Sequence, residues 1–138
     1  MDLLKVHKEE RLLHSDVTDE IISLFYKVYN SLGYGFLEQV YQNALYYELC
    51  KNGFECVAQK DINVYYDGRR VGMYRADIVV NDLIIIELKA TEEIHEAHIN
   101  QLTNYLRATE IEVGLLLNFG KKPEFKRRVF MNKYKKGE

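Results

Sequence analysis

Residues 75–90 read R-A-D-I-V-V-N-D-L-I-I-I-E-L-K-A, and this stretch decides the fold. Two apolar runs rich in β-branched residues flank the turn-forming pair Asn81-Asp82, which predicts a β-hairpin in a hydrophobic core. Three charged residues interrupt these runs: Asp77, Glu87 and Lys89. Burial of an isolated charge is strongly unfavourable, so these side chains need charged partners or a metal ion.

The length of the hairpin loop decides whether the two acids share a face of the sheet. Glu87 and Lys89 are two positions apart, so their side chains leave the same face of a strand. A two-residue loop would put Asp77 and Glu87 on opposite faces. A three-residue loop pairs Val80 with Ile84 and sets Asp77 across from Glu87. We therefore predict a loop of odd length or a bulge.

Two carboxylates and an ammonium group beside a packed sheet suit a hard divalent cation and a phosphate. Asp77 and Glu87 would supply oxygen ligands to Mg²⁺ (or Mn²⁺), which keeps several waters. The ion lowers the pKa of a bound water and neutralises charge on the phosphate, while Lys89 orients that water or stabilises the oxyanion. The alternative, a strand edge with a salt bridge, is disfavoured because three branched apolar residues precede Glu87.

The rest of the sequence predicts an α/β domain with a mixed central sheet flanked by helices. Apolar spacing of helical period alternates with runs of period two, and a strand, a helix and a further strand form a crossover unit. Part of the sheet should therefore be parallel. Helices are expected at about 15–31, 36–51 and 93–108, and strands at about 54–59, 62–66, 70–80, 83–89 and 112–118.

Three segments follow from this pattern. Residues 1–14 are expected to be peripheral, residues 15–120 to form a single domain, and residues 121–138 to form a basic segment in which Pro123 can begin a short helix. The chain has 138 residues, 47% of them hydrophobic, which is enough for one substantial core.

Composition also bears on location. The mixed charges of residues 1–10 do not form a signal peptide, and no apolar run is long enough to span a bilayer, so we expect a cytoplasmic protein without membrane contact. Cys50 and Cys56 do not have the spacing of a zinc site, and we expect them to be reduced core residues.

The charge is distributed unevenly. The chain has a formal net charge of −2, yet the segment from residue 121 onward holds eight basic residues against two acidic ones. A basic segment on an otherwise acidic protein suits a polyanion, although a solvated tail that aids solubility would have the same composition. The candidate nucleic-acid contacts in this segment are Lys121, Lys122, Arg127 and Arg128.

The D-x9-E-L-K pattern of Asp77, Glu87 and Lys89 resembles the core of the PD-(D/E)XK nuclease superfamily. Residues 35–41, G-F-L-E-Q-V-Y, are similar to the G-x-x-E-x-x-Y signature that names a small bacterial family within it. The motifs Q-L-T-N-Y-L at 101–106 and G-L-L-L-N-F-G at 114–120 also look like that family. The proline of "PD" is absent, at a position that varies in the superfamily.

The resemblance implies a restriction-endonuclease-like core and Mg²⁺-dependent hydrolysis of phosphodiester bonds in nucleic acid, with DNA as the favoured substrate. Glu38 becomes a further acidic ligand, although the same residue also suits a helix N-terminus. Tyr41 shares the helix face of Glu38 and is either a nucleic-acid contact or a core residue. Gln101 can orient a water or hold a phosphate oxygen, and Tyr105 can donate a hydrogen bond or stack on a base.

Two other functions remain compatible with the sequence. One is a nucleic-acid-binding module that keeps the fold without catalysis. The other is a protein-interaction module whose 11 tyrosines form an interface. A homodimer would suit a nuclease with one site per chain, because two copies could cut both strands of a duplex.

Overall fold

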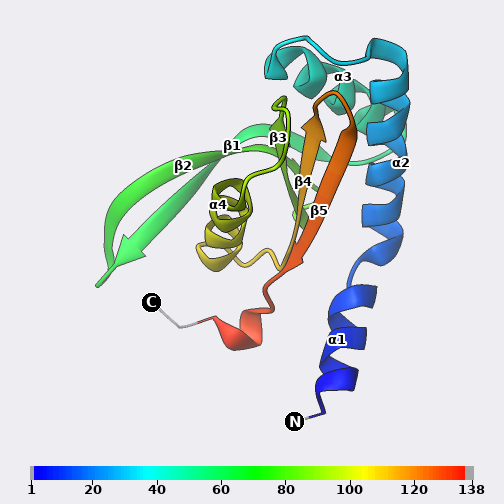
Figure 1. Cartoon of the computed structure of the whole chain (residues 1–138). Coiled ribbons are helices and arrows are strands. Elements are labelled where there is room, and N and C mark those ends of the chain that lie inside the picture. Colours follow the sequence, from blue (N-terminus) through cyan, green and yellow to red (C-terminus); the bar gives the residue numbers. More distant parts are fainter. Residues whose placement is uncertain (1, 136–138) are drawn as a thin grey trace.

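Five strands form one mixed sheet in the computed structural model, which describes residues 2–135 (Figure 1). The strands lie in sequence order, and only β3 and β4 run parallel to each other. This confirms the predicted α/β fold with a mixed sheet flanked by helices. The elements are α1 (Leu3–Leu12), α2 (Ser15–Leu32), α3 (Glu38–Lys51), β1 (Cys56–Tyr66), β2 (Arg69–Val80), β3 (Ile84–Lys89), α4 (Glu96–Arg107), β4 (Val113–Phe119), β5 (Pro123–Val129) and the 3₁₀ turn η1 (Asn132–Tyr134).

The loop of the β2–β3 hairpin has three residues. Val80 pairs with Ile84, and residues 81–83 form the turn between them. Asn81 and Asp82 both have a φ of 53°, a left-handed conformation that these two residue types tolerate. The side-chain oxygen of Asn81 also accepts a hydrogen bond of 2.8 Å from the backbone N–H of Glu55. The prediction of an odd-length loop is confirmed.

The central strands β3 and β4 and the adjoining end of β2 are buried on both faces of the sheet. Helices α2 and α3 cover one face, where Ile78, Ile86 and Leu115 pack against residues such as Phe25. Helix α4 covers the other face, packing Leu102, Tyr105 and Leu106 against Val79, Ile85 and Leu116. Burial on both sides explains why β3 reads as a continuous apolar run rather than an alternating one. Since α4 joins β3 to the parallel strand β4, the crossover unit is also confirmed.

Both ends of the described chain form regular elements. Residues 3–12 form helix α1, and the Arg127 guanidinium joins its C-terminal end to β5 by donating to the carbonyl oxygens of Glu10, at 2.9 Å, and Leu13. The prediction of a helix at Pro123 was wrong, because residues 123–129 pair with β4 as an antiparallel strand. Without that pairing, the buried strand β4 would leave one row of backbone groups without partners.

The cysteines also lie differently. Cys50 is exposed and Cys56 is half-buried, and both are free thiols. The expectation that they belong to the core was therefore wrong for Cys50.

The helices of the described part of the chain were compared with the requirements of a membrane span by length and hydropathy alone. None of its helices combines the length and the apolar character that crossing a bilayer requires.

Candidate active site

Asp77 and Glu87 lie on the face of the sheet that α4 covers. Val79 and Ile85 pair with each other and pack against α4, so the side chains two positions before and after them share that face. The Asp77 Oδ2 atom accepts a hydrogen bond of 2.8 Å from the backbone N–H of Leu88, which fixes Asp77 beside β3. The register therefore brings together the two carboxylates that the sequence predicted.

Glu87 is a buried acid that lacks a cationic partner. Its exposed fraction is 5%, and within residues 2–135 its Oε1 atom has no hydrogen-bond partner. The pKa of Glu87 is raised to about 9, first by burial and then by the charge of Asp77 and a hydrogen bond between the two carboxyl groups. Lys89 opposes this shift only weakly. The positive charge of the described residues is therefore too weak or too distant to keep Glu87 ionised at neutral pH.

Tyr105 closes the site from α4. Its exposed fraction is 6%, and its pKa is raised to about 12, first by burial and then by the charges of Glu87 and Asp77. The phenol is therefore close enough to both carboxylates to respond to their charge, and it stays protonated near neutral pH. Gln101 lies one helical turn earlier and lines a groove together with Tyr105.

Lys89, Glu38 and His98 meet at one end of the sheet. The pKa of His98 is lowered by burial, by Lys89 and by His95, whereas Glu38 raises it. The pKa of His98 thus responds to the charge of Lys89 at the end of β3 and to the charge of Glu38 in the first turn of α3. The backbone N–H of His95 donates to His98 Nδ1 at 3.2 Å, which orients the imidazole at the start of α4.

Sequence reasoning missed two glutamines that support Asp77. The Gln59 side-chain amide donates to Gln42 Oε1 at 3.0 Å and to Asp77 Oδ1 at 3.5 Å. Gln42 is itself buried on α3, with an exposed fraction of 6%. Neither residue stands out in the sequence. Gln59 fits the alternation of β1, and Gln42 fits the polar positions of α3. A buried glutamine one turn after Glu38 is visible only once α3 is placed against the sheet.

Gln59 also has an unusual backbone conformation. Its φ is 54°, which a non-glycine residue in a strand seldom adopts. The alternation of faces breaks at the same level of the hairpin, because Ile78 packs against α2 and α3 whereas Ala76, two residues away, packs against α4. The hairpin therefore bends at Gln59 and Asp77 and continues over α4 (Figure 1). Backbone strain of this kind often marks a functional site.

We predict opposite effects on stability and activity for Gln59→Gly. Glycine adopts a positive φ without strain, so the free energy of unfolding should rise by up to about 1 kcal/mol. Loss of the amide removes the contacts to Gln42 and Asp77, and cleavage of nucleic acid should fall by about tenfold. Urea unfolding and an initial-rate cleavage assay measure the two effects. Gln39→Gly, at an exposed position of α3 outside this contact, is the control that should leave cleavage unchanged.

Asn118 holds the segment that follows Lys89. This buried residue of β4 accepts a hydrogen bond from the Thr91 N–H and donates one to the Thr91 carbonyl oxygen, each at 3.0 Å. Gly120 packs so closely that an added Cβ would lie 2.3 Å from the Thr91 oxygen. The N-F-G portion of the motif at 114–120 thus fixes the backbone just beyond the E-L-K triplet.

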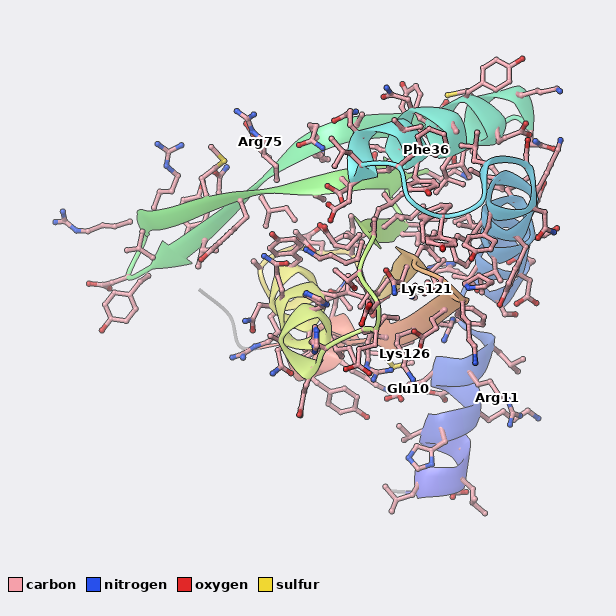
Figure 2. The ribbon with its side chains drawn as sticks, turned by 45° about the horizontal axis from the view of Figure 1, so that its top comes forward. Glu10, Arg11, Phe36, Arg75, Lys121 and Lys126 are labelled. Carbon is pink, nitrogen blue, oxygen red and sulfur yellow. The ribbon has the colours of Figure 1, made fainter. Side chains whose placement is uncertain are left out.

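The predicted nucleic-acid contacts fall into two groups. Tyr41 has an exposed fraction of 0% and stacks on Phe119 with 4.2 Å between ring centroids, so it is a core residue, and its prediction as a surface contact is wrong. Arg127 is held by the carbonyl groups at the end of α1, which makes it a structural residue. Lys121 and Lys122 are exposed in the turn between β4 and β5 (Figure 2). Arg128 is half-buried on β5 and donates to the carbonyl of Arg127 at 2.8 Å.

The carboxylates of Asp77 and Glu87 are the groups that could bind a divalent ion. Within residues 2–135, no three acidic, histidine or cysteine side chains form a metal-binding group, so Glu38 does not join Asp77 and Glu87 as a third close ligand. Mg²⁺ needs only one or two carboxylates, because waters and phosphate oxygens complete its shell. A buried carboxylate oxygen without a partner, next to a second carboxylate, fits this requirement.

Comparisons with known proteins agree with this geometry. The sequence pattern of the PD-(D/E)XK nuclease superfamily matches residues 15–128. The chain therefore belongs to the PD-(D/E)XK nuclease superfamily. This membership suggests nuclease activity.

Among solved structures, the crystal structure of the protein SSO0001 is similar in fold. The TM-score is 0.53 at 20% sequence identity, and the match covers 88% of this chain and 62% of SSO0001. The chain thus spans less than two thirds of the length of that protein. No curated protein matches the chain.

Proposed function

We propose that this protein is a Mg²⁺- or Mn²⁺-dependent nuclease of the GxxExxY type, which hydrolyses phosphodiester bonds of nucleic acid, with DNA as the favoured substrate. The observation that carries the proposal is the buried Glu87 carboxylate, which has an oxygen without a described partner beside Asp77. Superfamily membership makes nucleic acid the class of substrate. Asp77 and Glu87 are the proposed metal ligands.

Each residue has a distinct proposed role. The metal ion, when bound, supplies Lewis acidity and positive charge at the scissile phosphate. The Lys89 ammonium group donates hydrogen bonds to a phosphoryl oxygen and stabilises the negative charge that develops there. Gln59 and Gln42 keep Asp77 in position through their amide contacts. Tyr105 excludes water from the α4 side of the carboxylates.

The remaining candidates lie around this centre. Glu38 is proposed to act through a water rather than as a direct ligand, because it lies near His98 at the start of α3. Gln101 is proposed to hold a phosphate oxygen from α4. Lys121 and Lys122 are proposed to bind the backbone of the nucleic acid, since their turn adjoins Thr91, two residues after Lys89.

Cleavage by the purified protein tests the proposal. With Mg²⁺ or Mn²⁺, the protein should cut single-stranded or double-stranded DNA, and Lys89→Ala should reduce the rate by about 10²–10³-fold because charge stabilisation at the phosphate is lost. Lys51→Ala, at an exposed position in the last turn of α3, is the matched control and should cut normally. Equal cleavage by the Lys89→Ala and wild-type proteins would overturn the proposal.

A binding module without catalysis is the second candidate. The observation that favours it is the small donor set, since the described residues bring together only two acidic side chains beside Lys89. Such a module would bind nucleic acid with strong salt dependence and leave it intact in every divalent cation tested. A chain with one site needs a second copy to cut both strands of a duplex. Sedimentation of the same protein would show whether two copies associate.

A further inference from the structure

A large groove lies between α4 and the outer half of the β1–β2 hairpin, and Tyr105 of the candidate active site is among its lining residues. Its volume is about 1480 Å³. The residues that line it include Tyr65, Tyr66 and Tyr74 of the hairpin and Asn100, Asn104 and Tyr105 of α4. Pockets for small ligands measure roughly 300–1,000 Å³, so this groove suits an extended polymer better than a metabolite.

We infer that this groove binds a single-stranded segment of nucleic acid, whose bases stack on the tyrosine rings and whose 3′ or 5′ continuation reaches Asp77 and Glu87. The inference rests on the proposed function for the identity of the ligand as nucleic acid. It goes beyond that function by naming the strandedness of the substrate and the surface that selects it.

Three tyrosines of the hairpin line the groove, and one of them contacts Tyr105. Tyr65, Tyr66 and Tyr74 have exposed fractions of 51%, 74% and 50%, so a ligand can reach their rings. Tyr74 lies against Tyr105, with 5.6 Å between ring centroids and a tilt of 43°. Tyr105 lines the groove and also lies close enough to Glu87 and Asp77 to respond to their charge, so it is the wall that the groove shares with the candidate active site.

The polar residues of the groove suit nucleic acid rather than an apolar peptide. Arg107 supplies positive charge, and Asp67 is the single acidic residue among the described lining residues. The Lys135 ammonium group also lines the groove but is held by the carbonyl oxygens of Thr109 and Ile111. Arg69 and Arg70 extend the positive charge along the exposed end of the hairpin. Side-chain amides on α4 offer both donors and acceptors to bases and sugars. Arg75 points away from α4 and pairs with Asp61, so it lies outside the groove (Figure 2).

Strandedness follows from the chemistry of stacking. Every base has an aromatic face, but in a duplex the neighbouring base pairs already cover it. Exposed tyrosines in a groove can therefore stack only with unpaired bases, and they do so with little sequence preference. A duplex could use the positive charge alone, and its binding would not respond to removal of a tyrosine ring.

Fluorescence anisotropy with a labelled single-stranded oligonucleotide tests the inference. The protein carries Glu87→Gln and the buffer contains EDTA, so that binding is measured without cleavage. Tyr65→Ala and Tyr66→Ala should each raise the Kd for the single strand by at least about fivefold, and Tyr65→Phe should bind like the parent. Tyr47→Ala, an exposed tyrosine of α3 outside the groove, is the matched control and should bind normally.

The probes separate the possible outcomes. A duplex of the same sequence and an abasic strand of the same length should both bind more weakly than the single strand, with Kd values unaffected by Tyr65→Ala. Equal affinity for duplex and single strand, or unchanged single-strand binding by both alanine variants, would overturn the inference. Because these measurements contain no divalent cation, failure of cleavage in the separate assay would contradict the proposed function without affecting them.

Discussion

Glu87→Gln should make the protein more stable and, at the same time, inactive as a nuclease. The buried carboxylate has an ordinary pKa of 4.5 and a pKa of about 9 in the folded protein. Because of this raised pKa, Glu87 lowers the free energy of unfolding at pH 7 by about 3 kcal/mol. A neutral glutamine removes this unfavourable contribution. Cleavage should fall by about 10²–10³-fold, because a ligand of the proposed metal ion is lost.

The sign of the pH dependence follows from the raised pKa of Glu87. The folded protein holds a proton that the unfolded chain releases, so the contribution of Glu87 to stability is fully present below about pH 4.5 and is lost as the pH rises to about 9. Urea unfolding in EDTA between pH 5 and 9 should show this decline in the wild-type protein. Glu87→Gln should lack it, and Glu55→Gln, an exposed acid, should retain it.

Metal binding gives a second readout for the same residue. Because the ligand must be ionised, Mg²⁺ should stabilise the wild-type protein more at pH 8.5 than at pH 5.5 and should have little effect on Glu87→Gln. Parallel stability curves for wild type and Glu87→Gln, with and without Mg²⁺, would contradict the assignment of Glu87 as a buried acid that binds metal.

Tyr41 should prove essential for folding and dispensable for binding nucleic acid. Its ring is fully buried, stacks on Phe119 and lies at 6.1 Å from the Phe36 ring. Its hydroxyl donates to the Gly33 carbonyl at 2.7 Å and accepts from the Phe36 N–H at 3.2 Å. Tyr41→Ala should reduce the free energy of unfolding by about 3–5 kcal/mol, as for other buried aromatic residues.

Tyr41→Phe separates the ring from the hydroxyl. The stacking remains, and the loss of two hydrogen bonds should lower the free energy of unfolding by about 1–2 kcal/mol. Nucleic-acid affinity should stay within about twofold of wild type in the anisotropy assay. Tyr47→Ala, at a largely exposed site, should change stability by less than about 0.5 kcal/mol. A tenfold loss of affinity in a stable Tyr41→Phe protein would show that Tyr41 contacts the ligand after all.

The central hairpin could be predicted because its apolar pattern allowed few arrangements. The interrupting charges of Asp77 and Glu87 had to share a face, and only an odd loop achieved this, as the pairing of Val80 with Ile84 shows. The parallel pair followed from the helix between two apolar runs. In both cases, local sequence and long-range packing favour the same structure.

Other features depended on tertiary contacts that local patterns do not reveal. Residues 123–129 are rich in charge and begin with proline, yet they form a strand because β4 needs a partner. Tyr41 and Arg127 belong to types that often bind nucleic acid, but aromatic stacking holds one and backbone carbonyls hold the other. Gln59 became relevant only through its positive φ and its contacts with Gln42 and Asp77, which no spacing rule anticipates.

The bend at Gln59 has a consequence for how the chain can diversify. Beyond it, the outer part of the hairpin extends past the sheet (Figure 1). Glu87 and Lys89 lie on β3, and Asp77, at the bend, is held there by the backbone N–H of Leu88. Changes in the length of this arm, or in the aromatic residues it presents, leave the register of the acids untouched. Under the proposed function, substrate preference would therefore be separable from reaction chemistry, and the arm is where new preferences could arise.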